Sequence, residues 1–142
     1  MVWREMTEQE LATRPEARLG GALLWMVAAA AALFVVAVVG LLFGLPQFTG
    51  LGRYMIAVGF IALWSAVFVV MTLLRARVTP FVTSAGLIGW IVYRFVAALL
   101  GHTPWPFAID SLGEALLAAG FCGYMAGGVR PNAYYRRRLP AP

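Results

Sequence analysis

The chain alternates long apolar runs with short polar segments. Four such runs cover residues 19–44, 54–74, 80–100 and 107–127. The first two hold no charged side chain, whereas Arg94 interrupts the third, and Asp110 and Glu114 lie in the fourth. A helix needs about 20 residues to cross the roughly 30 Å hydrocarbon core of a bilayer, and each run is long enough. The pattern predicts an all-α integral membrane protein with four transmembrane helices in an antiparallel bundle, over residues 19–129.

Composition supports this class, since 62% of the 142 residues are hydrophobic and only 12% are charged. A water-soluble domain of this length has too little interior for so many apolar side chains. Residues 1–18 form a polar N-terminal segment, and the apolar run after it is too long for a cleaved signal peptide. Within residues 1–18, Thr7 and Glu10 have capping-box spacing. This spacing fits a short interfacial helix, although a frayed polar tail fits equally well.

The basic residues, all of them arginines, predict the orientation. Nine of the eleven lie in segments 1–18, 75–79 and 130–142, which the four spans place on one side, while Arg53 lies on the other and Arg94 inside. The positive-inside rule then puts both termini in the cytoplasm, as in a multi-pass protein of the bacterial inner membrane. The net charge of +5 is therefore a topology signal. We expect no nucleic-acid partner, because no soluble domain is present to hold a duplex.

Three charged residues inside the apolar runs form the main candidate site. Counting from the turn between the third and fourth runs places Arg94 at the depth of Asp110 and Glu114, which are four residues apart and share one helix face. A charge at membrane depth needs a partner, so we expect an ion pair of Arg94 with Glu114, assisted by Asp110. The cluster is either a clasp between two helices or a polar path that opens outward past His102.

Trp64 and Trp90 are predicted at similar depth near the middle of the bilayer. Indoles usually prefer the interface, and each N–H needs an acceptor. Core packing, with Ser65 or a carbonyl as acceptor, is one interpretation, and the wall of a lipid or quinone groove is the other.

Small residues recur at helical spacing in the first and fourth runs. They predict helix-packing faces because close backbone approach drives helix association in lipid. The faces comprise Ala28, Ala32, Gly40 and Gly44 in the first run, and Ala115, Ala119, Gly123 and Gly127 in the fourth, where Ser111 extends the row. Contact between these two helices would close the bundle, although the faces could equally receive a partner subunit.

The C-terminal segment, residues 130–142, joins two tyrosines to a run of arginines. Tyrosines at the interface with arginines beyond them suit contact with anionic headgroups or with a partner protein. The residues concerned are Tyr134, Tyr135, Arg136, Arg137 and Arg138. A generic flank that stops membrane transfer is the alternative interpretation.

The sequence offers little for chemistry. One histidine, His102, and one cysteine, Cys122, give no ligand spacing for zinc, iron or haem. No nucleophilic triad, phosphate-binding glycine loop or nucleotide fingerprint is present either. We therefore expect no enzyme, no catalytic residue, no metal and no cofactor.

Three short segments carry a resemblance to a known family. They are Leu19-Gly20-Gly21-Ala22-Leu23, the basic link before Pro80, and Tyr124-Met125-Ala126-Gly127-Gly128-Val129-Arg130 followed by Tyr134-Tyr135. The chain resembles a small bacterial four-helix membrane family known only as a domain of unknown function. Its members begin with Gly-Gly-Trp-Leu and end with Tyr-x-x-x-Ser-x-Arg, whereas this chain has Ala22 for the tryptophan and Gly128 for the serine. The resemblance implies a four-helix membrane fold and no established activity.

The predicted function is that of an accessory or scaffolding subunit of a larger membrane complex. Its expected partners are membrane lipids and other integral membrane subunits, or further copies of itself. The alternative is a small oligomeric transporter or channel that uses Arg94, Asp110 and Glu114 as its polar path.

Overall fold

The computed structural model describes residues 2–44, 52–101 and 105–141. Four long helices make up most of it: α2 (Gly21–Gly44), α3 (Gly52–Leu73), α4 (Thr79–Leu99) and α5 (Trp105–Gly127). Their bounds lie within two residues of the predicted runs, and with 81% helix the predicted all-α class is confirmed. Over the described residues, three helices are long and apolar enough to cross a membrane. A fourth qualifies if α5 and α6 (Val129–Arg136), which meet at 59°, count as one bent span.

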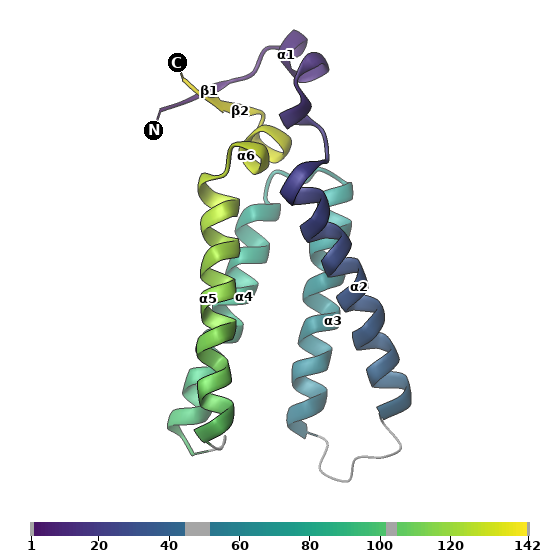
Figure 1. Ribbon diagram of the computed structural model, residues 1–142, viewed down its shortest axis with the longest axis vertical. Coiled ribbons are helices and arrows are strands. Elements are labelled where there is room, and N and C mark those ends of the chain that lie inside the picture. The colour runs from purple at the N-terminus through teal and green to yellow at the C-terminus, as the bar shows by residue number, and fades with distance from the viewer. Residues whose placement is uncertain (1, 45–51, 102–104, 142) are drawn as a thin grey trace.

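The long helices form two antiparallel hairpins, α2 with α3 and α4 with α5 (Figure 1). Both chain termini and the α3–α4 link lie at the same end of the helices, which we call the terminal end (Figure 1). The hairpins lie together there and draw apart toward the opposite end. In the described residues α2 and α5 do not form an extensive helix pair. The predicted contact between their small-residue faces, which would have closed the bundle, is therefore not made.

Aromatic side chains join the two hairpins instead. Phe60 of α3 stacks on Trp90 of α4 with ring centroids 4.5 Å apart, and Trp64 of α3 meets Phe121 of α5 edge-on at 5.4 Å. The Trp64 indole N–H donates a hydrogen bond of 3.0 Å to the carbonyl oxygen of Thr83 in α4. Large rings that meet between α3 and the second hairpin hold the helices farther apart than small residues would.

The two ends of the chain fold together into a small cap at the terminal end. Strand β1 (Trp3–Glu5) pairs antiparallel with β2 (Arg138–Pro140), with Arg4 opposite Leu139. Helix α1 (Glu8–Thr13), the short 3-10 helix η1 (Pro15–Ala17) and α6 complete it. Met6, Ala17, Ala133 and Leu139 are buried within the cap, and Leu11 packs against them. The sequence did not predict this cap, because each tail on its own has a polar pattern.

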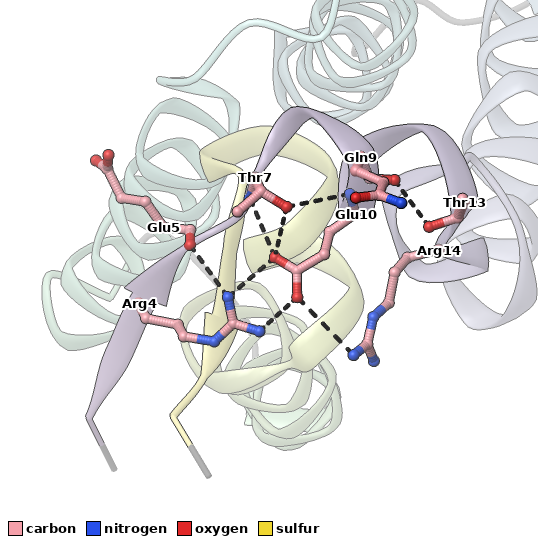
Figure 2. A network of polar contacts seen from close by, with 7 residues as sticks. All are labelled: Arg4, Glu5, Thr7, Gln9, Glu10, Thr13 and Arg14. Atoms are coloured by element: carbon pink, nitrogen blue, oxygen red, sulfur yellow. Dashed lines mark hydrogen bonds and ion pairs between the residues drawn. The ribbon is translucent and has the colours of Figure 1, made fainter.

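Helix α1 begins with the predicted capping box. The Thr7 hydroxyl accepts from the Glu10 N–H, and the Glu10 carboxylate accepts from the Thr7 N–H at 3.0 Å. Figure 2 shows Arg4 and Arg14 reaching the same carboxylate. Since Arg4 belongs to β1, its pair of hydrogen bonds with Glu10, at 2.9 and 2.5 Å, ties the strand to the helix. Of the two alternatives for this segment, a short helix and a frayed tail, the structure thus shows the helix.

Candidate functional site

An ion pair joins the two helices of the second hairpin. Arg94 Nη2 in α4 lies 3.3 Å from Glu114 Oε1 in α5, and Arg94 Nε donates to the Ser111 hydroxyl at 3.2 Å. Ser111 and Glu114 are three residues apart, so both lie on the same face of α5. The structure thus brings together Arg94 and Glu114, as their predicted depths require.

Trp90 supplies a second donor to the same carboxylate. Its indole N–H donates to Glu114 Oε2 at 3.1 Å, and the Arg94 guanidinium lies 5.9 Å from the centre of its ring. Trp90 is one turn before Arg94 on α4, which lets both side chains reach α5. Each oxygen of Glu114 therefore has a partner on α4. Sequence reasoning treated Trp90 and the charges separately, although their spacing was a signal that they share a face.

The polar cluster is only partly covered by protein. The side chain of Arg94 is 19% exposed and that of Glu114 is 39% exposed. The side chains of Asp110 and His102, which were predicted to assist the pair and to continue it outward, lie outside the described part of the structure. Chemically, the described contacts neutralise a charge pair and fix the register of α4 against α5.

The predicted packing faces lie mostly on the surface. Ala28 and Ala32 of α2 and Ala119, Gly123 and Gly127 of α5 are exposed, while Gly40 and Ala115 are half-buried and Gly44 lies outside the described side chains. The buried side chains of these helices are instead Leu23, Val27, Ala30 and Ala37 in α2, and Ser111, Ala118 and Met125 in α5. Apart from Ser111, which extends the predicted row of α5, the buried positions are therefore not those predicted.

Tyr134 and Tyr135 are buried, so their side chains do not lie exposed as the interfacial tyrosines that the sequence suggests. The Tyr135 hydroxyl lies 2.7 Å from Thr72 Oγ1, and the Tyr134 hydroxyl donates to the Thr72 carbonyl at 3.0 Å. The 59° bend after α5 turns the tyrosines back onto the end of α3. Their polar tips thus meet two buried polar groups of the same residue, the hydroxyl and the carbonyl oxygen of Thr72.

Arginines from two distant segments meet at the terminal end. Arg75 and Arg77 of the α3–α4 link line the same hollowed surface as Arg137, which follows α6. The sequence assigned a site only to the C-terminal arginines. The predicted topology places the α3–α4 link and the C-terminal tail on the same side of the membrane. That placement could have indicated that Arg75 and Arg77 belong to the same site.

No cluster of three or more potential metal-ligating residues occurs in residues 2–44, 52–101 and 105–141. Comparisons of the chain with protein-family models, curated proteins and solved structures return no match. Its function must therefore be inferred from its own residues.

Proposed function

We propose that the chain is a multi-pass protein of the bacterial inner membrane, with four spans and cytoplasmic termini. We propose further that it serves as an accessory or scaffolding subunit of a larger membrane complex. Its partners would be lipids and other integral subunits, or further copies of itself. No catalytic centre of its own belongs to this proposal.

The observation that carries the proposal is the exposure of the small-residue face of α5. Ala119 and Gly123 are exposed in the described structure, and a Cβ built on Gly123 would meet nothing within 4 Å. In lipid, apolar burial does not drive helix association, and small residues favour it by allowing close backbone contact. An exposed face of this kind suits a helix of another subunit.

The membrane placement is supported by the length and hydropathy of α2, α3 and α4. Their exposed surface is rich in large apolar side chains such as Leu42, Leu63 and Leu99. Such a surface would be an aggregation risk in water but is the ordinary outer surface of a membrane helix. The arginines at the terminal end support a cytoplasmic location for that end.

Native mass spectrometry after gentle extraction from its own membrane tests the subunit role. The wild type should carry bound protein subunits, and Ala119→Leu and Gly123→Leu should lose them because added bulk blocks close approach. Gly113→Leu adds similar bulk at an exposed position about 100° away around the helix, and should keep them. A wild-type chain detected without any bound subunit would overturn the proposal. Retention of the subunits by both Ala119→Leu and Gly123→Leu would overturn it as well.

The second candidate is a small oligomeric transporter or channel. It is favoured by one observation, the 39% exposure of the Glu114 side chain within an apolar helix. Liposomes that contain only this protein should then show a proton or ion flux, and Glu114→Gln should abolish that flux in a chain that stays folded. Absence of wild-type flux would overturn this candidate.

A further inference from the structure

A positively charged groove runs across the terminal end of the protein. Two adjoining hollows of about 430 and 400 Å³ share Glu8, Leu11, Arg77 and Arg137. We call their combined surface the arginine groove. Its charged residues come from three separate segments and comprise Arg75, Arg77, Arg136, Arg137 and Arg138, together with Glu5 and Glu8. Five arginines against two glutamates give the groove an excess of positive charge.

Several of these charges have no partner among the described residues. Across the described residues, the guanidinium groups of Arg77, Arg137 and Arg138 make no hydrogen bond or ion pair, and neither do the carboxylates of Glu5 and Glu8. Elsewhere in the cap, Arg4 and Glu10 are fully paired. Unpaired guanidiniums that converge on one hollow supply the donors that an oxyanion ligand needs.

Two of the arginines occupy backbone positions that favour glycine. Arg75 has φ of 52° and Arg137 has φ of 53°, and they are the two non-glycine residues with positive φ in the described chain. Each ends a helix, and the N–H groups of Arg75 and Ala76 bond back to Thr72 and Met71 in the pattern of a Schellman cap. Glycine would adopt either turn with less backbone strain. The presence of arginine at these two positions therefore points to a role of its side chain rather than of the turn.

Contacts with the buried tyrosines and the N-terminal segment shape the arginine groove. The Arg75 guanidinium lies 5.0 Å from the ring centre of Tyr134, whose hydroxyl is bonded to Thr72. On the side of the N-terminal segment, Leu11, Ala12 and Ala17 give the groove an apolar wall. The groove therefore combines cations with apolar contact, directly at the ends of helices that are apolar enough to span a bilayer.

We propose that the arginine groove binds the phosphate of an anionic phospholipid headgroup. Its net charge favours an anionic over a zwitterionic lipid, and the two glutamates can accept hydrogen bonds from headgroup hydroxyls such as those of phosphatidylglycerol. The apolar wall distinguishes a lipid, with its glycerol and acyl carbons, from a free phosphate ion. This inference rests on the membrane placement proposed above and is independent of the subunit role.

The test uses the purified full-length chain in detergent with equal amounts of phosphatidylglycerol and phosphatidylcholine, read by native mass spectrometry. The wild type should retain phosphatidylglycerol preferentially. Arg77→Gln and Arg137→Gly should each lower that retention about fivefold, the factor that corresponds to one cation near anionic headgroups. Arg14→Gln removes an equal charge outside the groove and should leave retention unchanged.

Arg137→Gly separates binding from folding. Glycine suits the positive φ, so this variant should unfold no more easily than the wild type while it loses lipid. Wild-type retention in Arg77→Gln and Arg137→Gly, or equal retention of the two lipids, would overturn the inference. Displacement of the lipid by millimolar inorganic phosphate would overturn it in favour of a soluble phosphorylated ligand. Alkaline extraction of cell membranes, done in parallel, tests the proposed membrane insertion separately. A peripheral protein would be released by this treatment, whereas an integral one would stay in the membrane.

Discussion

The Tyr135 hydroxyl lies 2.7 Å from Oγ1 of Thr72, although the two residues are 63 positions apart. Both side chains are buried, with exposed fractions of 1% and 0%. The bond fixes α6 against the end of α3 and so joins the C-terminal segment to the first hairpin. The short helix therefore belongs to the packed protein rather than to a loose tail.

Tyr135→Phe should lower the free energy of unfolding by about 1 kcal/mol, because it leaves the Thr72 hydroxyl buried without this partner. Unfolding in mixed micelles of increasing dodecyl sulfate content measures the change. Tyr93→Phe is the matched control, since Tyr93 is 44% exposed and the described contacts give its hydroxyl no hydrogen bond. Equal stability of both variants would contradict a structural role for the Tyr135 hydroxyl.

Glu114→Gln should lower the free energy of unfolding by about 2 kcal/mol, the range for hydrogen bonds to charged groups. The change removes the charge that compensates Arg94, while a glutamine oxygen can still accept from Trp90. The same titration measures it. Glu8→Gln, at an exposed carboxylate outside the long helices, should have almost no effect.

The partner association of Glu114→Gln decides between the two interpretations of the cluster. If the cluster is a clasp, association per folded molecule should persist in spite of the lower stability. If Glu114→Gln instead leaves the stability unchanged but abolishes a proton or ion flux, the ion pair belongs to a polar path through the membrane.

The hairpin register could be predicted from the sequence because short links leave antiparallel helices little freedom. Residue numbers alone therefore paired Arg94 with Glu114, and the structure places them 3.3 Å apart. The limits of the four long helices could also be predicted, since each coincides with an apolar run long enough to span a bilayer.

The packing between hairpins could not be predicted, because it depends on which faces meet. The small residues at Ala28 and Ala119 suggested a contact that the aromatic pair of Phe60 and Trp90 replaces. Likewise, the pairing of Arg4 with Leu139 joins residues from opposite ends of the chain, and neither tail shows a periodicity that reveals it. Tyr134 was misplaced because the bend before it depends on tertiary contacts with Thr72.

The cap should weaken in acid through Glu10. The hydrogen bonds from Arg4, followed by the bond from the Thr7 N–H, lower the pKa of the Glu10 carboxyl from 4.5 to about 2. Because the folded-state pKa is the lower one, this contribution is complete above about pH 4.5 and is lost as the pH falls toward 2. Hydrogen exchange of the cap amides between pH 5 and 2 should show the loss.

Glu10→Gln should remove that part of the pH dependence, because glutamine does not titrate. Glu8→Gln should keep it, since Glu8 makes no ion pair in the described cap. A wild-type profile that Glu10→Gln leaves unchanged would show that another carboxyl is responsible.

Gly128→Ala and Gly120→Ala should have opposite effects on stability. A Cβ on Gly128 would lie 2.5 Å from the carbonyl oxygen of Tyr124 and 3.0 Å from Cδ of Pro131, at the 59° bend between α5 and α6. Backbone and a proline ring cannot move aside easily, so this variant should lose about 2 kcal/mol of unfolding free energy. Gly120 lies inside α5 with nothing within 4 Å of such a Cβ, and alanine there should stabilise the helix by up to about 1 kcal/mol. The dodecyl sulfate titration compares them directly, and a Gly128→Ala chain as stable as Gly120→Ala would mean that the bend is not sterically required.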